Sequence, residues 1–290
     1  MKPLAALLVA VCVLGHARAV SATWIFDTDV GVLYDSNVGL GKLGRDIHSD
    51  TALNASVSAG RAMQIDDRNV VSLTGDVNGT AWDRFSGLNN VSLGLTTAFR
   101  SKLGVGPEVP WVRIAGSAAR QEYDIDVRDG WRYRLGGAIG KRFGERWDVR
   151  ADYAFDKFLA DHDRAVTPLL PGDVFDVTSH TFSGRAVFLY NEAISLAGGY
   201  ALREGDVVAT TRRNPQIFAA SSALTTDRAF GHDTFAYKID ATTHILSAGL
   251  SVVLGPRSSL NLGYERQIGA ARRGIDYYND VVRFRFLYSY

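Results

Sequence analysis

Sulfur-containing residues are nearly absent from this chain of 290 residues, which has one cysteine and two methionines. The cysteine, Cys12, lies in an apolar stretch close to the start of the chain, and no other thiol follows it. Since a disulfide bond needs two cysteines, we expect neither disulfide bonds nor thiol chemistry in the rest of the protein.

Long apolar runs and an excess of either charge are also missing. After residue 19 no apolar run approaches the roughly 18 residues that a membrane-spanning helix needs, which excludes a helical membrane protein. The 32 basic residues nearly balance the 31 acidic residues, and no polybasic stretch occurs. We therefore expect no nucleic-acid partner.

The start of the chain has the pattern of a secretory signal peptide. Lys2 gives it a positive start, an uncharged apolar stretch follows, and Ala17-Arg18-Ala19 is a small-x-small cleavage site. We predict a cleaved signal peptide over residues 1–19 and a single mature domain over residues 20–290. Cleavage after Ala22 is the alternative.

The end of the chain alternates between apolar and polar residues. Phe284, Phe286, Tyr288 and Tyr290 share one parity with Val282, whereas Arg283, Arg285 and Ser289 have the other. Because side chains of a strand point alternately to its two faces, this pattern predicts a strand with one apolar, aromatic face and one cationic face. A strand that ends the chain on an aromatic residue resembles the closing strand of bacterial outer-membrane β-barrels. The resemblance implies that Phe284, Phe286, Tyr288 and Tyr290 form the signal read by the barrel-assembly machinery.

About twelve segments of the mature chain alternate in this way. They cover residues 24–34, 51–62, 70–81, 90–100, 111–122, 131–139, 147–156, 178–190, 193–203, 235–254, 259–268 and 281–290. The pattern predicts an all-β protein, an antiparallel transmembrane β-barrel of about twelve strands. A soluble lipocalin-like barrel or sandwich is the alternative, and it would need its apolar face inside. The segment 235–254 is too long for one membrane strand, so we expect it to begin as a projection above the bilayer.

The connections between these segments alternate in length, with the longer set predicted on the outside of the membrane. The longer set covers residues 35–50, 82–89, 123–130, 159–177, 204–234 and 268–279. All six prolines after residue 20 fall in connections, where a missing strand hydrogen bond costs little. Within 111–122, Arg120 has the parity of the apolar residues, which predicts a β-bulge.

Aromatic residues near the two ends of the segments predict two girdles at the membrane surfaces. The lower girdle would hold Trp24, Trp111, Phe143, Trp147, Tyr190 and Tyr290, and the upper girdle Tyr34, Trp82, Tyr123, Trp131, Tyr200 and Tyr264.

The segment from Gly31 to Val38, GVLYDSNV, resembles the first hairpin of several Gram-negative barrel families. These include porin-like proteins tied to exopolysaccharide systems and the barrel of surface lipoprotein assembly modifiers. The resemblance implies an outer-membrane location. Physically, Tyr34 would lie at the outer membrane surface, and Asp35-Ser36-Asn37 would turn the chain through bonds from side chains to the backbone.

Charged residues on the inward parity are the candidates for lining the lumen and for selectivity. They are Asp27, Asp29, Arg134, Arg150, Asp152, Glu265, Arg283 and Arg285. Closure of the barrel would place Asp27 and Asp29 near Arg283 and Arg285, and a turn at 143–147 would pair Arg142 with Asp148 and Arg134 with Asp156. These charges either line a water-filled pore or form a packed core of ion pairs. The connection 204–234 is long enough to fold inward and constrict the lumen.

Catalysis and metal binding are not expected. His180, His232 and His244 are the candidate histidines of a lipid hydrolase, but the outward-facing His244 has Leu246, not a serine, two positions away. A calcium loop over Asp124, Asp126, Asp129 and Gly130 is interrupted by Arg128 and has Leu135 at its twelfth position. We expect no enzyme activity, no metal and no cofactor.

The function that these patterns favour is porin-like: passive diffusion of small hydrophilic solutes through a charged lumen in the outer membrane of a Gram-negative bacterium. Two alternatives stay open. One is a closed structural or adhesive barrel that acts through its extracellular loops, and the other is an accessory barrel of a polysaccharide or surface-export system. Outer-membrane lipid and lipopolysaccharide are the expected partners, the latter contacted by Arg212-Arg213 and Arg272-Arg273.

Overall fold

The computed structural model describes residues 21–271 and 274–290. The predicted signal peptide and Arg272-Arg273 lie outside these residues. The strands are β1 (Ser21–Asp35), β2 (Asp50–Gln64), β3 (Asn69–Trp82), β4 (Asn90–Lys102), β5 (Trp111–Tyr123), β6 (Gly130–Phe143), β7 (Trp147–Ala160), β8 (Val177–Leu189), β9 (Ile194–Arg212), β10 (Ala223–Thr226), β11 (Thr234–Gly255), β12 (Ser258–Ala271) and β13 (Ile275–Ser289). One α-helix, α2 (Pro215–Ala220), and four 3-10 turns, among them η2 (Ser86–Leu88), η3 (Asp126–Arg128) and η4 (Arg228–Phe230), complete the described elements.

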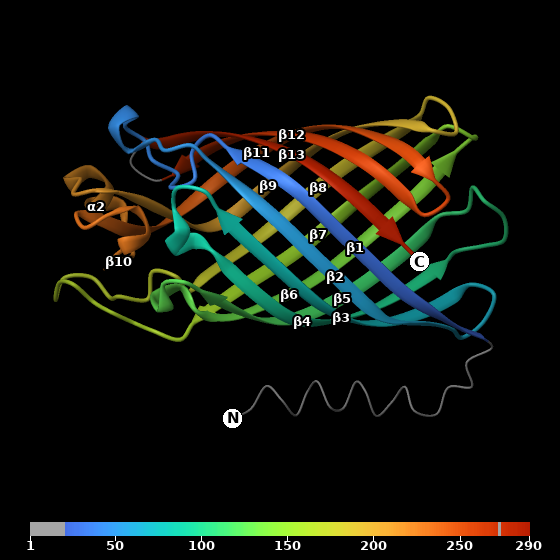
Figure 1. Ribbon diagram of the computed structural model, residues 1–290, viewed down its shortest axis with the longest axis horizontal. Coiled ribbons are helices and arrows are strands. Elements are labelled where there is room, and N and C mark those ends of the chain that lie inside the picture. Colours follow the sequence, from blue (N-terminus) through green and yellow to red (C-terminus); the bar gives the residue numbers. More distant parts are fainter. Residues whose placement is uncertain (1–20, 272–273) are drawn as a thin grey trace.

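Twelve strands close into one antiparallel barrel, with all but β10 taking part. Each strand pairs with its neighbour in the chain, β9 pairs with β11, and β1 pairs with β13 to close the ring. Figure 1 shows the strands tilted against the long axis, as closure of a sheet into a barrel requires. The predicted fold class and strand number are confirmed. None of the helices in the described ranges is long and apolar enough to cross a membrane.

The outer face of the barrel is apolar and the inner face polar. Trp24 on β1, Leu53 on β2 and Leu93 on β4 are 64%, 62% and 64% exposed, and all three have the outward parity. Their strand neighbours on the opposite parity, such as Ser56 and Ser92, face the lumen. A soluble barrel would have the reverse arrangement, because apolar surface exposed to water is unfavourable.

Connections of different length gather at the two ends of the barrel. Residues 36–49, 83–89, 124–129, 161–176 and 213–233 lie at the end that we call the mouth. Residues 65–68, 103–110, 144–146, 190–193 and 256–257 form the opposite end, which we call the base. The long connection predicted over 268–279 is wrong, because β12 and β13 stay paired as far as Ala271 and Ile275.

The bulge predicted in β5 is also wrong. Arg120 stays in register with Leu93 and Trp131 on both neighbouring strands and keeps its outward direction. Its Nη1 lies 2.5 Å from an Asp161 carboxylate oxygen near the mouth, so an outward cation is paired there without a change of register. Within the described residues, the pairing of barrel strands shifts at one place, between Val253 and Gly255 of β11.

Three of the predicted girdle residues face the lumen. Trp82 and Tyr123 lie opposite Ala52 and Asn90, on the inward parity of their strands. Trp111 packs on Gly140, where a Cβ atom would come within 2.4 Å of the indole. The other predicted members are outward and exposed: Trp24, Tyr34, Trp131, Phe143, Trp147, Tyr190, Tyr200, Tyr264 and Tyr290.

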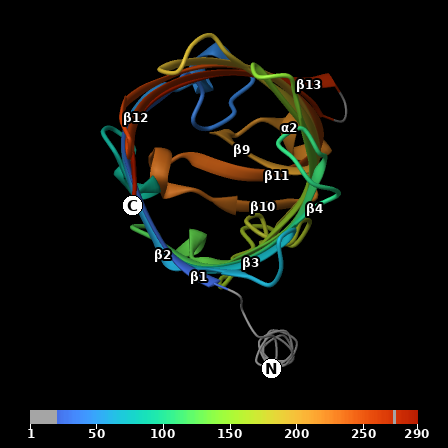
Figure 2. The ribbon, with the colours of Figure 1, turned by 90° about the vertical axis from the view of Figure 1, so that its right-hand side faces the viewer.

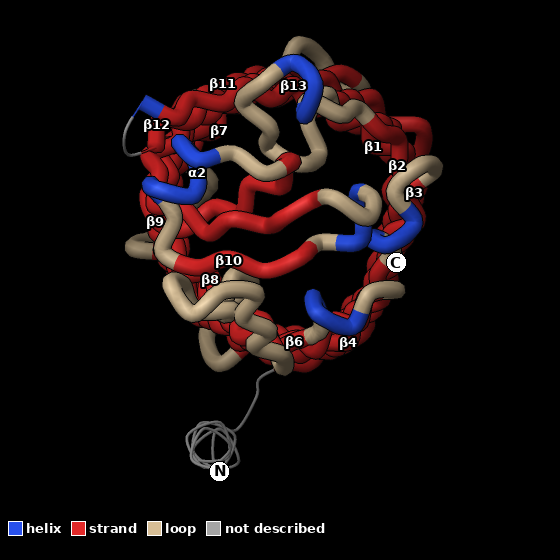
Figure 3. Tube along the Cα trace, turned by 90° about the vertical axis from the view of Figure 1, so that its left-hand side faces the viewer, coloured by secondary structure: helices blue, strands red, loops and turns tan. Residues whose placement is uncertain are grey.

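The strands β9 and β11 run past the barrel and form a cap over the mouth. We define the cap as residues 206–240, which include α2 and β10. In Figure 1 α2 and β10 lie beyond the left-hand end of the barrel strands. The end-on views show β10 and β11 crossing the ring of strands from one wall toward the other (Figures 2 and 3). The expected projection at the start of 235–254, and the inward fold of 204–234, are both present.

Candidate functional site

The lumen wall has an arc with many charges and an arc with few. Strands β6 to β8 and β12 to β1 supply most of the inward-facing charges. Strands β2 to β5 supply mostly small polar or apolar residues, including Asn54, Ser56, Ser58, Thr96, Ser117 and Ala119, together with Asp76 and the directly opposed Arg100 and Arg113. The lumen is therefore asymmetric in charge across its width.

Ion pairs join neighbouring strands at the seam, where β1 and β13 pair to close the barrel. Arg285 Nη1 lies 3.2 Å from an Asp29 carboxylate oxygen, and Arg283 Nη1 lies 2.6 Å from Glu265 Oε1. Asp27 accepts a hydrogen bond from Ser289 Oγ at 2.6 Å instead of pairing with an arginine. The prediction that closure brings β1 acids to the β13 arginines is confirmed for Asp29 alone.

A second set of pairs follows β6 and β7. The register places Arg142 opposite Asp148 and Arg134 opposite Asp156, as the turn at 143–147 predicted. Arg134 Nε donates to Asp156 Oδ2 at 2.6 Å. Arg132 also donates to Asp156, so two guanidiniums share that carboxylate.

Sequence reasoning missed the lumen residue Arg185. Arg185 lies on β8 directly opposite Arg150 on β7, and both point inward. Arg150 Nε lies 3.2 Å from Asp152 Oδ2, whereas Arg185 has no carboxylate within 4 Å among the described residues. The inward parity of Ser183 and Thr181 in the same segment was the signal that could have identified Arg185.

The middle of the lumen is not filled by side chains. Arg150 and Arg285 keep 44% and 48% of their side-chain surface exposed, although both point inward. A cavity of about 230 Å³ lies against the wall formed by β13, β1, β2 and β3. Its lining includes Asp29, Asn54, Ser56, Asn78, Arg283 and Arg285. Of the two arrangements considered from the sequence, exposed charges favour the solvated lumen over a packed ion-pair core.

Gly31 lets Arg285 cross the seam to reach Asp29. A Cβ atom at residue 31 would lie 2.4 Å from the Phe284 carbonyl oxygen and 2.7 Å from Arg285 Cγ. Backbone and side chain would both have to move, and overpacking of this kind costs about 1–3 kcal/mol. We expect Gly31→Val to lower the free energy of unfolding by that amount in a urea titration of the folded barrel. Gly79→Val is the control, because open space surrounds residue 79; equal stability of the two variants would contradict the prediction.

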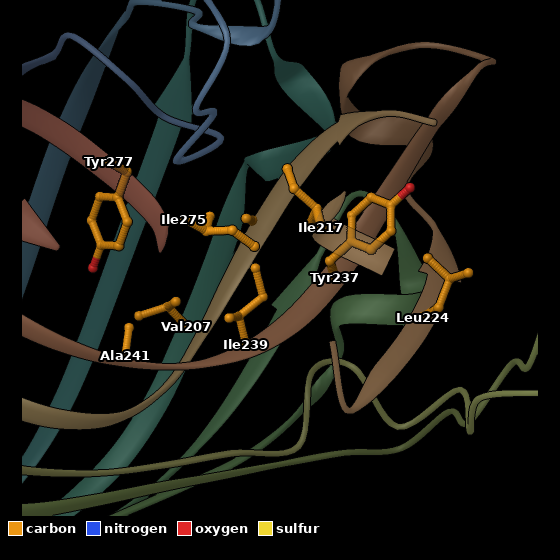
Figure 4. Close-up of a cluster of buried hydrophobic side chains, with 9 residues drawn as sticks. Val207, Ile217, Leu224, Tyr237, Ile239, Ala241, Ile275 and Tyr277 are labelled. Carbon is orange, nitrogen blue, oxygen red and sulfur yellow. The ribbon is translucent and has the colours of Figure 1, made fainter. Parts of the chain in front are cut away.

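The cap has buried side chains on both faces. On one face Val207, Ala209, Tyr237 and Ile239 pack with Ile217, Leu224, Ala241, Ile275 and Tyr277 (Figure 4). On the other face Ala223 and Ala236 pack with Val127, Phe158, Val174 and Phe175. Burial raises the pKa of the Tyr237 hydroxyl, which accepts a hydrogen bond from the Asn214 amide at 3.4 Å. The alternation that builds the barrel wall thus continues in a sheet covered on both sides.

Contacts tie the cap to connections around the mouth. Thr210 donates its amide to the Gly39 carbonyl at 2.7 Å, and the Leu224 amide donates to the Pro171 carbonyl at 2.9 Å. The Phe230 ring lies 4.8 Å from that of Phe85, on the wall opposite the origin of the cap. The cap therefore bridges the mouth.

Asp227 anchors the far end of the cap. Its side chain is fully buried, and Arg128 Nη2 lies 2.5 Å from its Oδ2. Thr210 Oγ1 donates to Oδ2 at 2.9 Å, and the Ala229 amide donates to Oδ1 at 3.2 Å. A buried carboxylate is stable here because a cation and two further donors satisfy it.

The turn predicted after β1 closes the seam at the mouth. The Asn37 amide donates to Asp35 Oδ1 at 2.8 Å, which is the expected bond from side chain to backbone. Asn37 is fully buried, and its Nδ2 donates to the Gly41 and Tyr278 carbonyls, each at 2.9 Å. The turn thus ties β1 to β13 beyond the last pair of the barrel ladder.

The candidate catalytic and calcium-binding residues form hydrogen bonds and ion pairs with neighbouring residues. His180 and His244 lie on the outer face, where each Nδ1 is hydrogen-bonded to a tyrosine hydroxyl. Asp126 pairs with Arg164, and Asp129 accepts the Tyr123 amide. Within the part of the chain that is described, no three His, Cys, Asp or Glu residues gather into a potential metal site.

Solved structures with this fold are outer-membrane proteins. An outer membrane channel of Pseudomonas putida F1 aligns with 95% of this chain and 98% of its own, at 13% identity and a TM-score of 0.61. The translocator domain of the autotransporter NalP from Neisseria meningitidis aligns with 98% and 94%, at 12% identity and a TM-score of 0.50. No protein-family model and no curated protein sequence matches the chain. At these identities the similarity shows the fold alone, a closed antiparallel β-barrel.

Proposed function

We propose that this protein is a porin-like channel of the Gram-negative outer membrane, through which small hydrophilic solutes diffuse. The observation that carries the proposal is the solvated lumen of a barrel with an apolar exterior: the inward Arg150 and Arg285 are exposed, and Arg285 borders a cavity of about 230 Å³. Passage of this kind needs a polar wall and no catalytic group.

The location and assembly of the protein are part of the same proposal. The signal peptide over residues 1–19 would direct export, and the mouth would face the cell exterior. Phe284, Phe286, Tyr288 and Tyr290 would be read by the barrel-assembly machinery, and outer loops such as the one carrying Arg212 and Arg213 would contact lipopolysaccharide.

Conductance of the refolded mature protein in a planar bilayer tests the proposal. We expect discrete, steady channel openings, because hydrated ions can occupy a lumen whose charges are solvated. Heat-dependent mobility on a gel would confirm that the inserted protein is folded. A folded barrel that stays silent would contradict the channel function.

A closed barrel that acts through its outer loops is the second candidate. The cap favours it, because the cap is packed on both faces and contacts connections across the mouth. This candidate predicts silence in the bilayer and loss of function when the loops 159–177 or 204–234 are trimmed.

A further inference from the structure

Two arginines face each other directly on neighbouring strands of the lumen wall. Arg150 of β7 and Arg185 of β8 are cross-strand partners on the inward face. Like charges in directly opposed positions destabilise a sheet, so the pair works against the stability of the barrel. A third guanidinium, that of Arg285 on β13, points into the same lumen and is 48% exposed.

The carboxylates nearby do not balance these arginines. Asp152 pairs with Arg150 and Asp29 pairs with Arg285. No carboxylate lies within salt-bridge distance of Arg185 in the described part of the chain. These three guanidiniums and two carboxylates together carry one net positive charge.

Strands β2 to β5 offer mostly hydroxyl, amide and small apolar side chains to the lumen. Their inward charges are Asp76, which accepts hydrogen bonds from Ser58 and Thr96, and the directly opposed Arg100 and Arg113, so this wall also has more guanidiniums than carboxylates. A guanidinium without a carboxylate partner, beside solvated space, is suited to an oxyanion, because its N–H groups match the geometry of such a ligand. In a narrow lumen with low-dielectric walls, such an unbalanced charge acts strongly on passing ions.

We propose that Arg150, Arg185 and Arg285 form the selectivity zone of the channel and that its solutes are small anions. This inference rests on the proposed channel function and names its substrate class. Arg185 is the determining residue, since the charges of Arg150 and Arg285 are offset by their carboxylate partners.

Reversal potentials across a KCl gradient test the proposal in the refolded mature protein. We expect the wild type to prefer chloride, and Arg185→Gln to lower the ratio of chloride to potassium permeability about fourfold. Because the charge acts with opposite sign on chloride and on potassium, that factor corresponds to a unit charge roughly 10 Å from the permeating ion at the dielectric constant of water. Arg150→Gln combined with Arg185→Gln leaves one guanidinium against two carboxylates, and should reverse the preference to potassium.

Matched variants separate the role of Arg185 from a general effect of charge. Lys157→Gln removes one positive charge from the exposed outer face of β7 and should leave the ratio unchanged. Arg185→Lys keeps the charge and should retain most of the chloride preference of the wild type. Conductance without chloride preference, or a ratio unaffected by Arg185→Gln, would overturn the selectivity zone and leave the channel function standing. Silence of the folded wild type would overturn both.

Discussion

Replacing residues 213–233 by an Asn-Gly turn should raise the single-channel conductance several-fold. The replacement removes α2, β10 and η4, and with them Ile217, Leu224 and Phe230 from the packed cap. Arg212 and Thr234 are cross-strand partners, so a two-residue turn can join β9 to β11 at that point. The barrel ladder itself contains none of the removed residues, and we expect the variant to fold.

A single substitution at the anchor of the cap provides a finer version of this experiment. Asp227→Asn keeps the shape of the side chain but has one acceptor oxygen for the donors Thr210 and Ala229, and it leaves Arg128 without its buried counter-ion. Loss of one partner of a buried ion pair costs about 3–5 kcal/mol, and in this variant the loss lowers the stability of the closed cap. We expect openings of larger conductance to become more frequent, together with faster proteolysis within 213–233.

A connection at the mouth supplies the control for the cap variants. Asp126→Asn removes a carboxylate of an exposed ion pair, with Arg164, at the same end of the barrel. Exposed pairs contribute about 0–1 kcal/mol, so this variant should conduct like the wild type. An unchanged conductance after replacement of 213–233 would show that the cap does not restrict the path, and a lower conductance would favour a structural role of the cap in keeping the lumen open.

The alternation of residues was sufficient to predict the barrel. Because one face of each strand is apolar and the other polar, the period of two survives over all twelve segments, from Trp24–Tyr34 to the closing strand. The same reasoning failed where tertiary contacts determine the direction of a side chain. Trp111 faces inward because Gly140 opens a site for its ring, and Arg120 faces outward without a bulge because Asp161 is within reach.

The cap shows the limit of reading one segment at a time. Residues 235–241 alternate just as the barrel strands do, but both of their faces are covered by connections far apart in the sequence. α2 and β10 are too short to be stable alone, and the clusters around Ile217 and Ala223 determine where they form. Arg185 was missed for a related reason, since its importance depends on its position opposite Arg150 and on the pairing of Asp152 with Arg150.

Asn37→Ala should be among the most destabilising single substitutions outside the lumen. The amide side chain of Asn37 bonds to the Gly41 amide, the Gly41 carbonyl and the Tyr278 carbonyl, at 2.8 to 2.9 Å. Removal of the side chain leaves these groups unsatisfied in a fully buried position, at about 1 kcal/mol or more for each bond. We expect the free energy of unfolding in urea to fall by about 3 kcal/mol.

The location of Asn37 determines how that loss should appear. Asn37 joins the turn after β1 to β13, and these two strands close the barrel, so the seam should open before the other strand pairs. Hydrogen exchange of the β1 and β13 amides near the mouth should therefore accelerate more than exchange in β3 and β4. Asn78→Ala is the matched control, because Asn78 is exposed beside the lumen cavity. Equal stability of the two variants, or acceleration spread evenly around the barrel, would contradict the view that this turn holds the seam closed.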